Sequence, residues 1–157
     1  MTDAKVLDKG FQFIMRQLVE TGRAPHYAEL ALALGCTTEQ ARQTLHEIFK
    51  AGYPGWLHPG TDLIATFPPL SSLPIQYRVS VDGEQKWFAQ CGFEALAVCW
   101  LFPAQTVRIE APCLDCAEPL SLEMRDGQLL AVDPPALLGH CNSSWSLLGT
   151  PGILPHL

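Results

Sequence analysis

The sequence has no long hydrophobic run, few charged residues and no excess of basic residues. Its longest uninterrupted apolar stretch, Ala95 to Phe102, has eight residues, which is too few to span a bilayer. Charged residues make up 17% of the 157 residues, and the formal net charge is −6. These values argue against a membrane-spanning protein. They also exclude a surface that coats nucleic acid broadly with positive charge, although a local basic patch remains compatible with them.

The N-terminal residues carry no export-signal pattern. Met1 to Gly10 contains two aspartates and two lysines, whereas a signal peptide needs an apolar segment after a basic start. Hydrophobic residues make up 48% of the sequence, which is enough apolar surface to offset the loss of chain entropy on folding. We therefore expect a folded cytoplasmic protein with no membrane partner.

The number of cysteines is unusual for a chain with no export signal. The six cysteines are Cys36, Cys91, Cys99, Cys113, Cys116 and Cys141. Without an export signal, and with a chain apolar enough to fold without cross-links, we expect free thiols rather than disulfides. Some of these thiols pack in the core, as expected for Cys99 in its apolar surroundings, and others could be metal ligands or reactive thiolates.

Residues 1–66 are predicted to form a winged-helix-like helical unit. Helical spacing of apolar residues predicts helices at 5–21, 27–34 and 39–51, the last with a capping box from Thr37 to Gln40, and two short apolar pieces follow at 56–65. Residues 1–75 contain six basic and seven acidic side chains, whereas a DNA-reading unit concentrates positive charge. We therefore favour a packing or dimerisation role and expect no nucleic-acid partner.

The second half is predicted to be rich in strands. Prolines mark residues 67–75 as an extended linker, and residues 76–157 then form a small β domain. Alternating residues and the turns Asp82-Gly83 and Asp126-Gly127 predict hairpins, 90–101 is the one strong helix, and 142–148 could be a last strand. The fold class is α+β: the N-terminal unit plus a mixed or antiparallel sheet with one central helix.

Cys91 and Glu94 are the first candidate site. Cys91 stands at the expected start of the helix, where unpaired N–H groups and the helix dipole favour the thiolate. Glu94 is three residues later and therefore lies on nearly the same face. The pair could be a nucleophile or soft-metal ligand beside a proton carrier. The alternative is an ordinary buried cysteine followed by an acidic residue typical of a helix N-terminus.

Cys113 and Cys116 form a CxxC turn between two predicted strands, the second candidate site. Such a turn can supply two thiolates to zinc. A structural zinc site needs four ligands, and only Cys141 with His140 could complete it through the fold. The alternatives are a tight turn that carries two thiols by chance, or half of a site shared between subunits.

The second half resembles the organomercurial lyase (alkylmercury lyase) family. The segment from Trp87 to Leu96 is similar to that family's Trp-x-x-x-Cys-x-x-Asp-x-Leu motif, with Glu94 in place of the usual aspartate. Residues 106–132 are similar to the strand, turn and hairpin that follow in the family, and the stretch from Cys141 is similar to its second cysteine segment. The family also has an N-terminal helical unit.

The resemblance implies a function and assigns residue roles. In the family two cysteines bind mercury and a carboxylic acid supplies a proton, so Cys91 and Cys141 would be the thiolates and Glu94 the acid. No cofactor is required, Hg(II) is the bound product, and small thiols accept it. The partners would be an organomercurial or a soft metal ion, with zinc at Cys113 and Cys116 as a further expectation. A form of the site that only binds soft metal remains open.

Two other classes of function also remain open. The first is a metal-responsive transcriptional regulator, in which the winged-helix-like unit binds DNA and the cysteines sense metal. Basic surface on residues 39–51 and on the hairpin would favour it. The second is a zinc-stabilised interaction module without activity, which the CxxC turn would support.

Overall fold

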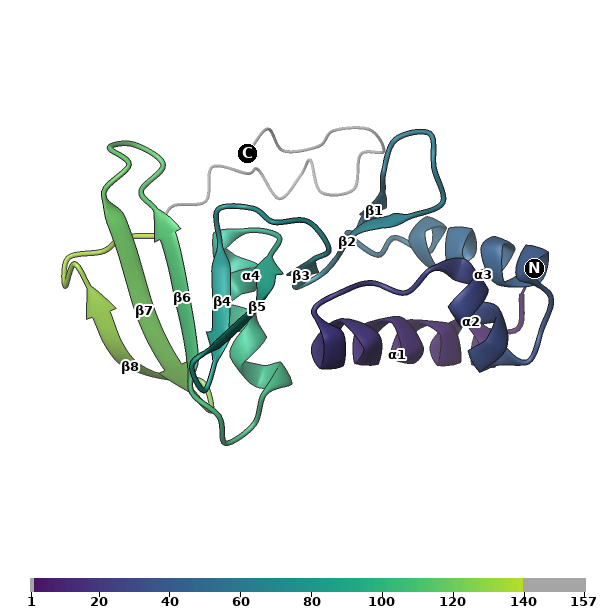
Figure 1. The fold of residues 1–157 in the computed structure, drawn as a ribbon, viewed down its shortest axis with the longest axis horizontal. Helices are drawn as coiled ribbons and strands as arrows, with labels where there is room; N and C mark the ends of the chain where they lie inside the picture. Colours follow the sequence, from purple (N-terminus) through teal and green to yellow (C-terminus); the bar gives the residue numbers. More distant parts are fainter. Residues whose placement is uncertain (1, 140–157) are drawn as a thin grey trace.

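The computed structural model describes residues 2–139 as a helical unit beside a long antiparallel sheet (Figure 1). The helices are α1 (Ala4–Thr21), α2 (Tyr27–Leu34), α3 (Thr38–Lys50) and α4 (Gly92–Ala97), and α4 continues as the 3₁₀ helix η1 (Val98–Leu101). The strands are β1 (Trp56–Leu57), β2 (Ile64–Phe67), β3 (Leu70–Ser71), β4 (Arg78–Val81), β5 (Glu84–Ala89), β6 (Val107–Pro112), β7 (Pro119–Arg125) and β8 (Gln128–Asp133). Within the described residues, no helix is both long and apolar enough to cross a membrane.

Local signals in the sequence set the helix ends. Thr37 caps α3 through the predicted capping box, in which its hydroxyl accepts from the Gln40 N–H and the Gln40 side chain accepts from the Thr37 N–H. Gly22 and Gly35 end α1 and α2 in the left-handed conformation. At Gly22 a side chain would also meet the Lys86 carbonyl oxygen at 2.6 Å, so a larger residue there would push α1 away from β5.

The strands form one sheet in the order β1-β2-β3-β5-β4-β6-β7-β8, and all the pairings are antiparallel. The α+β class is therefore confirmed. Both predicted hairpin turns are present, with positive φ at Asp82, Gly83, Asp126 and Gly127, the conformation that suits the twist of flanking strands. The strand predicted at 142–148 lies outside the described residues.

Residues 67–75, predicted as a linker, contain strand β3. Leu70 and Ser71 are buried, and they pair with β2 on one side and with Phe88 and Ala89 of β5 on the other. The hairpin of the winged-helix-like unit is thus part of the same sheet as β4 to β8. The division into domains at 1–66 and 76–157 stays a prediction, because hydrogen bonding runs through the segment between them.

One core joins the helices to the sheet. Buried Ile14 and Leu18 of α1 belong to the same apolar cluster as Val79 and Val107 of the central strands. Trp87 of β5 connects the sheet to α1. The residue is 5% exposed, and its Nε1–H donates to the carbonyl oxygens of Leu18 and Val19, both at 3.0 Å. Buried indole N–H groups need such partners. The same core positions the start of α4, which follows directly from β5.

Candidate functional site

Cys91 lies where β5 passes into α4. Its backbone is extended, and it is the N-cap residue of α4. The Sγ atom accepts a hydrogen bond from the Glu94 N–H, with 3.4 Å between sulfur and nitrogen. The sulfur therefore satisfies an N–H group that has no partner inside the helix. This contact brings the thiol and the backbone of the acidic residue together on one turn.

Glu94 carries a carboxyl group in a half-buried position. Its Oε2 atom is buried and has no hydrogen-bond partner among the described residues. Burial raises the pKa of Glu94, and hydrogen bonds with Cys91 oppose part of that rise. A carboxyl group with a raised pKa holds its proton at a higher pH than an exposed glutamate, which suits a group that must deliver a proton.

The thiol form of Cys91 is favoured, and this corrects an expectation from the sequence. The helix N-terminus was expected to favour the thiolate, but burial raises the pKa of Cys91 and outweighs the hydrogen bond from the Glu94 N–H. The nearby Glu94 charge also raises it. The physical reason is that α4 has only six residues, so its dipole is small, whereas removing a thiolate from water is costly.

Two tyrosines that the sequence did not single out lie beside this pair. Tyr53 donates from its hydroxyl to the Pro68 carbonyl, and burial together with the Glu94 charge raises the pKa of Tyr53 to about 12. The Tyr77 ring lies against Gly92, where an added Cβ would be 3.5 Å from a ring carbon and 3.6 Å from the hydroxyl. Tyr53 therefore stays neutral at ordinary pH beside Glu94.

Two further buried polar atoms, without a partner in the described part of the chain, belong to residues just after β5 and just after β3. Gln90 donates through its N–H to the Pro69 carbonyl and through Nε2 to the Pro54 carbonyl. Its Oε1 atom, and Oγ of Ser72, are buried without a hydrogen-bond partner among residues 2–139. These residues sit in irregular segments, so no periodic signal in the sequence could have identified them. Buried polar atoms without partners often mark a site for a ligand or water.

Apart from Cys91 and the CxxC turn, two cysteines lie within the described residues. Cys141 lies outside the described residues, so its closeness to Cys91 stays a prediction. Cys99 is buried in the core, with 1% of its surface exposed, as its apolar neighbours indicated. Cys36 is half-buried and packs against the edge of the core.

Cys113 and Cys116 lie on a tight turn between β6 and β7. The Cys113 N–H donates to the Glu118 carbonyl at 2.8 Å, and the Cys113 carbonyl accepts from the Ala117 N–H at 2.9 Å. Backbone hydrogen bonds from Cys116 and Asp115, and a hydrogen bond with the Cys116 thiol, lower the pKa of Cys113. Hydrogen bonding with the Glu118 backbone lowers the pKa of Cys116, but the interaction with the Cys113 thiol, burial and nearby negative charge together raise it.

In the described structure, the CxxC turn is not part of a larger group of side chains that could hold a metal ion. No group of three or more His, Cys, Asp or Glu side chains that could hold a metal occurs within residues 2–139. A structural zinc ion takes four ligands, and the turn supplies two. The expectation of zinc at Cys113 and Cys116 therefore has no support from the described residues.

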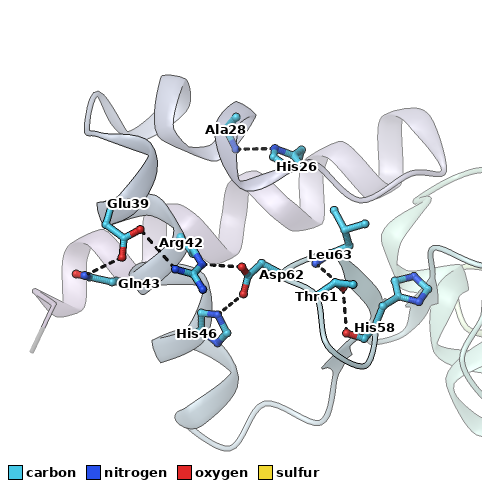
Figure 2. Close-up of polar contacts among 10 residues, drawn as sticks. All are labelled: His26, Ala28, Glu39, Arg42, Gln43, His46, His58, Thr61, Asp62 and Leu63. Carbon is cyan, nitrogen blue, oxygen red and sulfur yellow. Dashed lines mark hydrogen bonds and ion pairs between the residues drawn. The ribbon is translucent and has the colours of Figure 1, made fainter.

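The loop of the β1–β2 hairpin contacts side chains on the exposed face of α3 (Figure 2). Asp62, in the loop between β1 and β2, accepts from Arg42 Nε and contacts His46 Nε2, both at 2.6 Å. Arg42 also lies 3.5 Å from Glu39. The hydrogen bond from Arg42 is the largest of the interactions that lower the pKa of Asp62. The Asp62 carboxylate therefore stays charged beside the basic groups. These contacts neutralise charge that a DNA-reading helix would present to phosphates.

Comparisons with known proteins place this site in context. Residues 70–144 match the family model described as alkylmercury lyase, MerB, and the match covers just under half of the 157 residues. The matched range includes all the residues named as candidate ligands or acid: Cys91, Glu94, Cys113, Cys116 and Cys141. A search of curated proteins gave no match.

Among solved structures, the fold is similar to that of the mercury-bound form of MerB2, with a TM-score of 0.63 and 18% identity over 85% of this chain. This chain spans 62% of the length of that protein. At this identity the likeness establishes the fold, including the helical unit beside the sheet, and leaves the activity to be proposed. Residues 70–144 are similar to the alkylmercury lyase family, whose model they match, and the resemblance seen in the sequence is confirmed for that segment.

Proposed function

We propose that this protein carries organomercurial lyase-type chemistry, the protonolysis of a carbon–mercury bond, at Cys91 and Glu94. The observation that carries the proposal is the contact between them, in which the Cys91 sulfur accepts from the Glu94 N–H at 3.4 Å. It lies inside the segment that matches the alkylmercury lyase family. The similar MerB2 structure was solved in a mercury-bound form, which supports mercury as the ligand of the corresponding fold.

The raised pKa values of Cys91 and Glu94 suggest how the proton moves. The resting site holds the Cys91 thiol. When a soft R–Hg⁺ ion binds, the sulfur must lose its proton, because the thiolate is the form that ligates metal. Glu94 is the acidic group on the same helical turn, and its raised pKa makes it a suitable acceptor for that proton.

The carbon–mercury bond then breaks by transfer of the proton from Glu94 to carbon. A second thiolate, assigned to Cys141 by resemblance, adds electron density to mercury and makes the carbon more basic. The products are R–H and Hg(II) held by two sulfurs, and Glu94 returns to the carboxylate. One of the two thiol protons ends on carbon and the other in solvent, so atoms and charge balance without any cofactor.

Release of Hg(II) requires other thiols. Small thiols can exchange with the protein sulfurs and carry the metal away, because each incoming thiol replaces one sulfur ligand. Such exchange needs a compartment in which thiols stay reduced, and we propose the cytoplasm for this reason. The DNA-binding alternative has less support. On the helix that would read the duplex, Arg42 and His46 already contact the Asp62 carboxylate of the same chain.

The test is release of methane from methylmercury in the presence of excess small thiol, measured by gas chromatography of the headspace. We expect turnover by the wild-type protein and none by Cys91→Ser, because a hydroxyl is a poor ligand for a soft metal. Cys36→Ser is the matched control, since Cys36 is a half-buried thiol in the helical unit. Methylmercury that binds to the wild-type protein without releasing methane would reduce the proposal to soft-metal binding.

A further inference from the structure

The CxxC turn and Cys91 leave the sheet at the same edge. Strand β4 pairs with β5 on one side and β6 on the other, and Arg78 lies opposite both Phe88 and Glu110. Because β5 and β6 are each antiparallel to β4, they run in the same direction. Neighbouring strands are about 4.8 Å apart, so Phe88 and Glu110 are separated by roughly 10 Å.

The two thiol segments follow these paired positions at equal intervals. Cys91 comes three residues after Phe88, and Cys113 comes three residues after Glu110. The β5 strand ends at Ala89 and passes into α4, whereas β6 ends at Pro112 and passes into the turn that Figure 1 shows at the head of the β6 arrow. The topology therefore brings a dithiol and the proposed catalytic cysteine to one end of the sheet.

The turn holds both sulfurs in an accessible arrangement. The two backbone hydrogen bonds of Cys113, to Glu118 and from Ala117, close the loop. Cys113 and Cys116 are separated by two residues within this loop. Cys116 is exposed and Cys113 is partly exposed. A soft metal carried by a small thiol can therefore reach them without any opening of the core.

We propose that Cys113 and Cys116 form a second soft-metal site, which receives Hg(II) after it leaves Cys91. Two thiolates can hold a soft cation such as Hg(II), whereas zinc in a structural site takes four ligands. In the transfer each thiol replaces one sulfur ligand of mercury, and its proton passes to the thiolate that leaves. Mercury stays Hg(II) throughout, so no oxidant or reductant takes part.

The source of the metal in this inference rests on the proposed lyase function, but binding at the turn does not. Binding is tested with mercuric chloride, which contains no carbon–mercury bond. Protein with Cys91→Ser and Cys141→Ser is loaded in the presence of excess glutathione and desalted, and retained mercury is measured by mass spectrometry. We expect one retained equivalent, and at least a tenfold loss when Cys113→Ser and Cys116→Ser are added.

Controls keep the binding test open to refutation. Cys36→Ser in the same background should leave retention unchanged. If the variant lacking Cys91 and Cys141 does not fold, as judged by circular dichroism, the comparison is made in the wild-type background, where Cys113→Ser with Cys116→Ser should remove one equivalent. Retention that is independent of Cys113 and Cys116 in either background would overturn the site.

Transfer between the sites is tested by the number of turnovers without added thiol. Wild-type protein should release a second equivalent of methane from methylmercury, because the CxxC turn clears mercury from Cys91 after the first. Protein with Cys113→Ser and Cys116→Ser should stop after one equivalent and resume when glutathione is added. Equal yields from the two proteins would refute the transfer, whereas no methane from either would refute the lyase proposal and leave the binding result to stand.

Discussion

Replacing Glu94 with glutamine separates proton delivery from mercury binding. The substitution keeps the length of the side chain and removes the proton that can be transferred. The backbone N–H of residue 94, which donates to the Cys91 sulfur at 3.4 Å, is unaffected, so Cys91 should still bind an organomercurial. The substitution removes the carboxylic acid, the group whose pKa is raised by burial.

The magnitude follows from the role of a general acid. Such a group contributes roughly a hundred- to ten-thousand-fold to a rate, which corresponds to about 3 to 5 kcal/mol of transition-state stabilisation. We expect Glu94→Gln to lower the single-turnover rate of methane release by this factor. Glu94→Asp keeps an acid on a shorter arm and should recover part of the rate, because the carboxyl position is sensitive to small displacements.

The assay follows methane from a stoichiometric complex of methylmercury with the protein, with bound mercury quantified in parallel. In this preformed complex Cys91 has already lost its proton, and Glu94 exchanges protons with solvent. The rate should therefore fall as the pH rises through the pKa of Glu94, which lies above the ordinary value for glutamate, since only the protonated acid can donate. Glu94→Gln should lose this pH dependence. An unchanged rate in Glu94→Gln, at equal mercury occupancy, would refute the assignment of Glu94 as the proton source.

Three further predictions concern stability and the helical unit. Trp87→Phe should lower the free energy of unfolding, measured in urea, by about 2 to 3 kcal/mol. The substitution removes the indole N–H that donates to the end of α1, and it leaves a small cavity. Trp100→Phe is the matched control and should change little, because that side chain is 72% exposed. Asp62→Asn should lower the melting temperature at neutral pH. The difference from wild type should shrink as the pH falls through the folded pKa of Asp62, because Arg42 and His46 lower that pKa and the stabilisation exists only above it. A difference that does not change with pH would contradict this. The protein should show no tight binding to duplex DNA, and an affinity that falls steeply with salt would instead reveal several phosphate contacts.

Features set by neighbouring residues in the chain were predictable from the sequence. The capping box at Thr37 and Gln40, the turn at Asp82-Gly83 and the helix that begins after Cys91 depend on local hydrogen bonds and φ preferences. The structure has each of them. The helix predicted at 90–101 begins instead at Gly92, after Cys91 as N-cap, and changes to a 3₁₀ helix at Val98.

Features set by distant residues were not predictable in the same way. Strand β3 has two residues within a proline-rich segment, and it forms because β2 and β5 present edges on both of its sides. The direction of the Cys91 pKa depends on burial, which the local sequence does not define. The contribution of Tyr53 to the surroundings of Glu94 likewise requires the helical unit to be packed on the sheet.

The central claim is that an exchangeable proton from this site is delivered to a mercury-bound carbon. A single turnover of methylmercury in deuterated water tests it most directly, with the released gas analysed by mass spectrometry. We predict monodeuterated methane in one-to-one proportion to the Hg(II) that remains on sulfur, and no gas from Cys91→Ser. Methylmercury recovered intact from the wild-type complex, or methane without deuterium, would contradict the claim.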